Sequence, residues 1–179
     1  WTRLKALQAS EASIEVASSG IRVSPDITLR DYQVEAIEKW FENNCLGLME
    51  MATGTGKTIT ALAAAARLYE QQNRLALIVA CPYQHLVDQW YEEARRFGFV
   101  PSRASSSRTS WLDELNQGVL HFAHEDIPSL CIITTHATFA SEHFQGTIAR
   151  LSGPRLLVAD EVHHMGSGQR RNFLPGDID

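Results

Sequence analysis

Short apolar runs alternate with longer amphipathic segments along the chain from about Ile27 onward. The apolar runs predict strands at Leu46–Met51, Leu75–Ala80, Leu130–Thr134 and Arg155–Ala159. The amphipathic segments predict helices at about Asp31–Asn44, Lys57–Gln71, Tyr83–Phe97 and His136–Leu151. Because runs such as LALIVA and LLVA are continuously apolar, these strands are expected to be buried on both faces. The pattern therefore predicts an α/β fold, with helices on both faces of a mostly parallel central sheet.

Three stretches depart from this alternation. Ser102–Ser110 is dominated by serine and is interpreted as an exposed loop, and Trp111–Gln117 is compatible with a short helix after it. The pattern of Val119–Ser129 leaves its structure open. The first 25 residues are interpreted as an N-terminal extension or the tail of an upstream domain, which leaves residues 26–179 as the main domain.

Composition restricts the kind of protein. The chain has 179 residues, of which 44% are hydrophobic and 21% charged, a balance that fits one globular domain. Its formal net charge of -5 gives no support to a generally basic protein that coats nucleic acid, so phosphate contacts are expected to be local. The longest apolar stretches run to about eight residues, against about 20 for a membrane-spanning helix, so no membrane partner is expected.

The three cysteines Cys45, Cys81 and Cys131 include no CxxC pair. They are interpreted as buried thiols rather than as a zinc site or a disulfide framework. Free thiols suit a reducing compartment, so we expect a cytoplasmic location.

The segment MATGTGKT, from Met51 to Thr58, lies between a predicted strand and a predicted helix. A glycine-containing turn lets backbone N–H groups point inward at a phosphate chain, and the new helix presents its positive end. Thr53, Gly54, Thr55 and Gly56 are the candidate cradle.

Within this segment, Lys57 is expected to reach the β and γ phosphates, and the Thr58 hydroxyl to bind Mg²⁺. The pattern departs from GxxxxGK[ST] because Met51 stands where the first glycine would be. The positions that carry the chemistry are retained.

The apolar run LLVA ends in two adjacent carboxylates, Asp160 and Glu161. Open α/β sheets place their ligands at the carboxyl ends of strands. We therefore assign Asp160 to Mg²⁺ and Glu161 to the catalytic base that deprotonates the water attacking the γ phosphate. Two acids after a strand are also a common surface cap, and the phosphate motif is what favours the catalytic interpretation.

The continuation of this pair, DEVHH, together with MATGTGKT, resembles the DExH branch of the superfamily 2 helicases and translocases. LRDYQVEAI (Leu29–Ile37) resembles the segment in which this family reads adenine, and CPYQHLVDQW (Cys81–Trp90) and ITTHATF (Ile133–Phe139) resemble its motifs Ia and Ib. Within the superfamily the sequence is most similar to the type III restriction-enzyme and excision-repair (XPB-like) motors, which act on double-stranded DNA. The resemblance implies a RecA-like P-loop NTPase domain that uses ATP and Mg²⁺.

The resemblance also implies roles for further residues. Gln33, with Arg30 or Tyr32 nearby, would bind adenine, although a polar residue at a helix start is the alternative. His163 would couple the site to a second motor domain, with an exposed turn residue as the alternative, and the exposed interpretation is favoured for His164. Contacts with nucleic-acid phosphates are expected from the ends of the motif Ia and Ib strands, at Pro82, Gln84, Thr135 and His136.

Two arginines and two tryptophans could also contact nucleic acid, but the sequence favours a structural interpretation for each. Arg103 and Arg108 are expected to be solvated loop residues rather than electrostatic partners of nucleic acid. Trp40 and Trp90, at helical spacing among apolar neighbours, are expected to belong to the core rather than to stack on bases.

Superfamily 2 motors close two RecA-like domains on ATP. The sequence contains neither the Ser-Ala-Thr nor the QxxGRxxR motif of the later part of such motors, so we expect a second RecA-like domain in the parent chain and an isolated fragment that is nearly inactive. An RNA-directed motor, a non-catalytic nucleic-acid-binding module and a small-molecule phosphotransferase are the alternatives left open.

Overall fold

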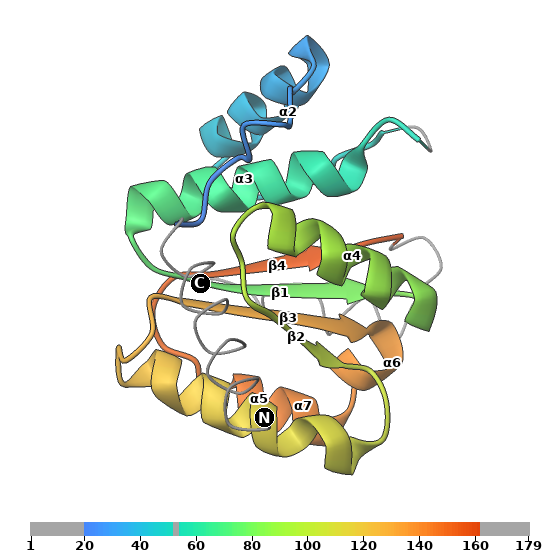
Figure 1. Cartoon of the computed structure of the whole chain (residues 1–179), viewed down its shortest axis with the longest axis vertical. Coiled ribbons are helices and arrows are strands. Elements are labelled where there is room, and N and C mark those ends of the chain that lie inside the picture. Colours follow the sequence, from blue (N-terminus) through green and yellow to red (C-terminus); the bar gives the residue numbers. More distant parts are fainter. Residues whose placement is uncertain (1–19, 52–53, 162–179) are drawn as a thin grey trace, which may run out of the picture.

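The computed structural model describes residues 20–51 and 54–161, and the expectations for residues 1–19 and 162–179, His163 included, fall outside it. A parallel β-sheet lies between two layers of helices (Figure 1). The strands are β1 (Leu75–Cys81), β2 (Pro101–Ala104), β3 (Ser129–Thr135) and β4 (Arg155–Ala159). The helices are α2 (Asp31–Glu42), α3 (Lys57–Gln72), α4 (Gln84–Arg96), α5 (Arg108–Ala123), α6 (His136–Phe139) and α7 (Glu142–Ile148).

The strand order is β2-β3-β1-β4, and every neighbouring pair is parallel. The register aligns Cys81 of β1 with Thr135 of β3, and Ala80 of β1 with Ala159 of β4. All four strands therefore end at the same edge of the sheet. This confirms the α/β fold class and places the candidate motifs that follow β1, β3 and β4 along one edge.

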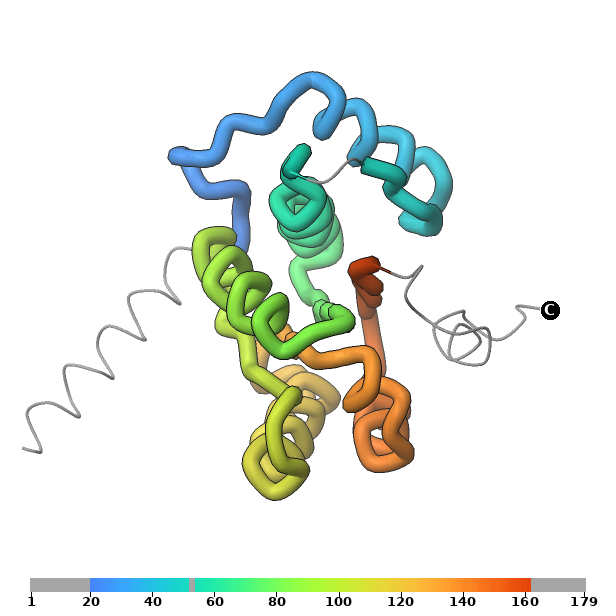
Figure 2. The backbone as a smooth tube through the Cα atoms, turned by 90° about the vertical axis from the view of Figure 1, so that its right-hand side faces the viewer, coloured from blue at the N-terminus to red at the C-terminus, as the bar shows by residue number. Residues whose placement is uncertain are grey.

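Alternate side chains of the central strands enter two separate cores. Leu75, Leu77 and Val79 pack with α2, α3 and α4 on one face, and Ala76 and Ile78 pack with α5, α6 and α7 on the other. Burial on both faces explains why these strands are continuously apolar in sequence. In Figure 2, α2 (blue) lies outside α3 (teal), so this side of the sheet carries a second helical layer.

The strand predicted at Leu46–Met51 is wrong, because this segment forms no strand. After α2 the chain reverses through Asn44 and Cys45, both with left-handed backbone conformations (φ 55° and 61°). Leu46 and Leu48 are then 53% and 69% exposed. Among the described residues, no strand pairs with the outer edge of β4, and β4 is only half-buried.

Other differences concern the second half of the chain. The loop expected at Ser102–Ser110 contains most of β2, whose Pro101 and Ala104 are buried, and the beginning of α5. Helix α5 also includes the short predicted helix and part of the segment left open. The single helix predicted at His136–Leu151 is two, because Ser141 begins α7 as a new N-cap whose hydroxyl accepts the Phe144 N–H.

The cysteines are free thiols. Cys81 and Cys131 are buried, as expected, whereas Cys45 is half-buried. Burial raises the pKa of the Cys81 thiol to about 12, and it also raises the pKa of Cys131.

Candidate functional site

The phosphate motif forms a turn that leads into α3. Gly54 and Gly56 have left-handed φ angles of 79° and 86°, and Lys57 is the first residue of α3. The N–H groups of the first helical turn lack acceptors within the helix, so they are directed toward the space in front of Lys57. Thr58 is the next residue of α3, and Thr53 lies outside the described residues.

Gly56 is required at its position for two independent reasons. Its positive φ is rarely adopted by residues with a side chain. A Cβ on Gly56 would also lie 2.7 Å from Nε2 of Gln33, closer than real Cβ contacts. The turn is therefore built around a close approach between α2 and the start of α3.

Gln33 makes this approach. Its side chain is buried, its Oε1 accepts the Arg30 N–H at 2.9 Å, and its Nε2 donates to Thr60 Oγ1 at 3.1 Å and to the Gly56 carbonyl at 3.4 Å. The amide thus caps α2 and holds the phosphate turn at the same time. Gln33 is therefore a buried residue at the start of α2 and not an exposed one.

Tyr32, which the resemblance placed near adenine, adds a second support to the phosphate turn that the sequence interpretation did not foresee. Its hydroxyl donates to the Thr55 carbonyl at 2.8 Å, and the exposed Arg30 guanidinium donates to the same hydroxyl at 3.1 Å. The signal was its position directly before Gln33, which places both side chains at the start of α2.

The acidic pair follows β4. Glu161 has a left-handed backbone (φ 53°), and its Oε1 lies 2.9 Å from Nζ of Lys57. This contact joins two motifs that are 104 residues apart in sequence. The hydrogen bond to Glu161 raises the pKa of the Lys57 ammonium.

Asp160 is fixed at both its backbone and its side chain. Its N–H donates to the Ala80 carbonyl at 2.8 Å, which continues the pairing of β4 with β1. Its Oδ2 accepts the indole N–H of Trp90 at 3.0 Å. Trp90 is core, as expected, but its polar atom faces the candidate Mg²⁺ ligand, a contact that the apolar pattern of α4 gave no sign of.

These groups share one cavity of about 590 Å³. Its polar lining includes Lys57, Asp160 and Glu161, and its apolar wall comes from α2, α3, the 47–51 segment and β4. The size lies within the range of small-ligand sites. A carboxylate oxygen and a threonine hydroxyl are hard donors that suit Mg²⁺, which keeps several waters and needs only one or two protein ligands. No cluster of three or more metal-ligating side chains occurs in the part of the chain that is described.

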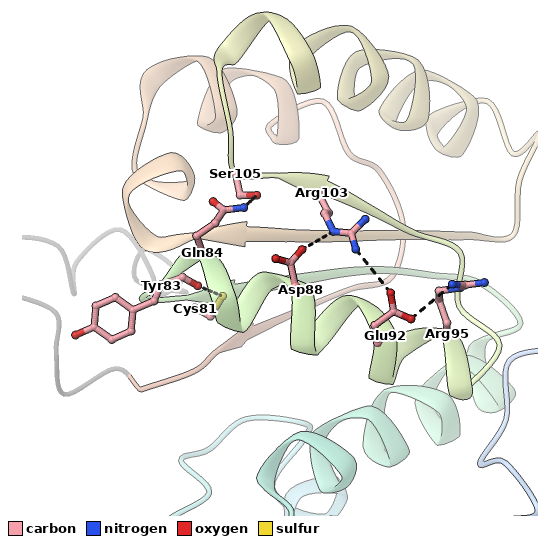
Figure 3. A network of polar contacts seen from close by, with 8 residues as sticks. All are labelled: Cys81, Tyr83, Gln84, Asp88, Glu92, Arg95, Arg103 and Ser105. Atoms are coloured by element: carbon pink, nitrogen blue, oxygen red, sulfur yellow. Dashed lines mark hydrogen bonds and ion pairs between the residues drawn. The ribbon is translucent and has the colours of Figure 1, made fainter.

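The four candidate nucleic-acid residues lie at the same edge of the sheet, after β1 and β3. Gln84 donates to the Ser105 hydroxyl at 2.8 Å and so connects the start of α4 with the turn after β2 (Figure 3). The Thr135 hydroxyl accepts the Thr138 N–H and caps α6. His136 is only 8% exposed, so a phosphate contact there would use its backbone rather than its ring.

The two arginines near this edge differ. Arg103 is held by Asp88 at 2.9 Å and Glu92 at 3.8 Å (Figure 3). Its guanidinium also lies 3.3 Å from the Tyr91 ring centre. Its charge is therefore compensated by α4. Arg108, at the start of α5, contacts Nε2 of His143 at 2.8 Å and is exposed.

In the described part of the chain, no helix is long and apolar enough to cross a membrane.

A cavity lined by Lys57, Asp160 and Glu161, beside the N-terminus of α3 and the carboxyl end of β4, is typical of a nucleotide-binding α/β domain. The chain belongs to the family described as type III restriction enzyme, res subunit, whose model matches residues 26–174. It is an ATP-binding motor domain of the superfamily 2 helicases and translocases, with a RecA-like fold.

Two known proteins illustrate the similarity. The DNA 3'-5' translocase XPB2 of Sulfurisphaera tokodaii is 26% identical over 163 residues, which cover 88% of this chain and 31% of the relative. A nuclease-deletion mutant of the Type ISP restriction-modification enzyme LlaGI, solved in complex with a DNA substrate mimic, matches with a TM-score of 0.62 at 21% identity. That match covers 76% of this chain and 15% of the enzyme and shows a shared fold. The chain thus spans about a third of the translocase's length.

Proposed function

We propose that this domain binds ATP and Mg²⁺ in the cavity at the strand ends, and that within its parent protein it hydrolyses ATP to move along double-stranded DNA. The observation that carries the proposal is the contact between Lys57 and Glu161 inside a cavity that Asp160 also lines. Family membership supports the ATP-dependent motor class. The similarity to the DNA 3'-5' translocase XPB2 supports DNA rather than RNA as the nucleic acid along which the motor moves.

The side chains divide the chemistry. The Lys57 ammonium and the N–H groups of the first turn of α3 bind the phosphates, and Thr58 and Asp160 hold Mg²⁺. When bound, the ion neutralises charge that develops on the phosphate oxygens. Glu161 accepts the proton of the attacking water, which requires its carboxylate to leave Lys57 when the phosphates arrive.

Adenine recognition belongs to the same proposal. Gln33 supports the phosphate turn through Gly56 and Thr60, and Arg30 lies exposed beside it at the start of α2. The base would therefore lie against this end of α2, where its hydrogen-bonding edge can use donors and acceptors of Gln33.

The isolated chain is proposed to bind nucleotide and to turn it over barely. A second RecA-like domain in the parent protein would supply arginines that complete the site, and an arginine finger contributes roughly 10³- to 10⁵-fold in rate. His163, two residues beyond Glu161, is the proposed link to that domain. Pro82, Gln84, Thr135 and His136 would lie against the DNA backbone.

Nucleotide binding by the Lys57→Ala variant tests the site. Loss of a charge-assisted contact worth about 1.5 to 3 kcal/mol is expected to weaken ATP binding in calorimetry by roughly 10- to 150-fold. Lys39→Ala is the matched control, because Lys39 is an exposed lysine paired with Glu35 at 2.6 Å. Equal ATP affinities of the two variants would contradict the assignment of the site.

The choice between DNA and RNA as the nucleic-acid substrate is tested separately in the parent protein. Its ATPase activity is expected to rise with double-stranded DNA and not with RNA of the same length. Stimulation by RNA alone would replace the DNA assignment while leaving the nucleotide site in place.

A further inference from the structure

Trp90 joins an apolar helix face to the acidic end of β4. It lies on α4, is 2% exposed, and donates its indole N–H to Oδ2 of Asp160 at 3.0 Å, across 70 residues of sequence. The same indole lines the cavity together with Lys57 and Glu161. It is therefore a buried donor directed at a group of the nucleotide site.

The chemistry of indole limits what this contact can do. Indole N–H is a donor without an acceptor, so Trp90 can neither bind a cation through nitrogen nor act as a base. It can only hold one oxygen of the carboxylate. A buried indole N–H also needs a partner, so the hydrogen bond ties the orientation of the ring to that of Asp160.

The position of Asp160 makes such a restraint important. β4 is the outer strand of the described sheet and is only half-buried, so its end is held from one side by the backbone bond to Ala80. Helix α4, by contrast, is anchored by Val87 and Ala94, both fully buried. Trp90 thus connects a less supported carboxylate to a rigid element.

We propose that Trp90 is a positioning residue for the magnesium site: its N–H fixes the Asp160 carboxylate through Oδ2, so that this carboxylate is held in place for the Mg²⁺ it would bind. The inference rests on the proposed function. It adds a residue that acts on the metal through Asp160 and touches neither the metal nor the substrate.

The test is the Mg²⁺ dependence of ADP binding by the full chain, with Trp90→Phe as the variant. This change removes the N–H and keeps an aromatic ring. ADP affinity measured in EDTA is expected to stay within about two-fold of wild type, while the half-saturating Mg²⁺ concentration rises about 10-fold, as for other partners of metal ligands. Trp111→Phe is the control, because Trp111 is equally buried but packs against Phe144 in the opposite core.

The outcomes separate the two proposals. A Trp90→Phe variant with the Mg²⁺ dependence of wild type overturns the positioning role while leaving the nucleotide site standing. Absence of ADP binding in wild type, or a Lys57→Ala variant that binds normally, overturns the proposed function instead.

A second measurement needs no change at Trp90. The indole N–H resonances of the protein's four tryptophans are assigned from the Trp1→Phe, Trp40→Phe and Trp111→Phe variants, so that the remaining resonance is that of Trp90. The Trp90 resonance is expected to move on adding Mg²⁺ to the ADP complex, and to move without Mg²⁺ in Asp160→Asn. A resonance insensitive to both changes refutes the contact even if Trp90→Phe does not fold.

Discussion

The ion pair between Lys57 and Glu161 competes with the phosphates for the same ammonium. Nζ and Oε1 are 2.9 Å apart, and the two side chains are 33% and 26% exposed. Glu161→Gln removes the negative charge but keeps the volume and an oxygen acceptor. We expect this variant to bind ATP more tightly than wild type, because Lys57 is then less restrained in the empty site.

The size of the gain follows from the geometry. Two unit charges at 2.9 Å interact by about 1.4 kcal/mol at the permittivity of water. Partial exposure, side-chain entropy and salt reduce the net value of such a pair to about 0.5 to 1 kcal/mol. The expected change in Kd is therefore about 2- to 5-fold.

The pH dependence has a definite sign. Glu161 raises the pKa of Lys57 above its ordinary value of 10.5, so the pair contributes fully below that pH and is lost as pH rises through the raised pKa. The gain in ATP affinity should accordingly stay constant between about pH 6 and pH 9.

Titration calorimetry at fixed Mg²⁺ and low salt measures the effect. Glu125→Gln is the matched control, since it makes the same change of net charge and breaks the Arg74–Glu125 pair, also 2.9 Å, at the opposite edge of the sheet. If Glu161→Gln binds ATP no more tightly than Glu125→Gln does, the ion pair does not restrain the site and the reasoning is refuted.

Two further changes test the surroundings of the site. Gly56→Ala should lower the free energy of unfolding by about 1 to 3 kcal/mol, because Gly56 has a positive φ and lies close to the Gln33 amide. Calorimetric melting measures this loss. The control is Gly146→Ala in α7, which should not be destabilising because the new Cβ would meet nothing within 4 Å. With a pKa of about 12, Cys81 should be thiolate in only about one molecule in 10⁴ at pH 8. In the native protein a thiol reagent should therefore modify no cysteine other than Cys45, whereas after denaturation it should modify all three. Rapid labelling of Cys81 in the native protein would contradict its burial.

The sequence predicted the central strands because strands whose side chains are buried on both faces of a sheet are continuously apolar. β1 and β3 extend one or two residues beyond the predicted ends, and β4 has the predicted bounds. The same signal failed at Leu46–Met51, since an apolar run reports the character of side chains and not the presence of a pairing partner. β2 was missed for the opposite reason: its two inner residues are polar and only its ends are buried.

The candidate site likewise contains features that the sequence predicted and features that it did not. Glu161 could be expected at this edge, because it follows a strand of the parallel sheet. The contact with Lys57 does not follow in the same way, since no strand forms at Leu46–Met51 before the phosphate motif. The support of the phosphate turn by Tyr32, and the direction of the Trp90 indole, depend on how α2 and α4 are rotated against the sheet. Helical periodicity places both residues on a face, but it does not say which polar atom a buried side chain brings to that face.

The outer position of β4 gives these contacts their importance. A strand paired on one side only leaves its last residues with fewer backbone restraints, and Asp160 and Glu161 come directly after such a strand. Each carboxylate is instead held by a side chain from another element: Asp160 by Trp90 of α4, and Glu161 by Lys57 of α3. Under the proposed function, only the second of these contacts has to break when phosphates bind. The geometry would then separate a carboxylate that stays in place, as the proposed metal ligand must, from one that is released on binding, as the proposed base must be.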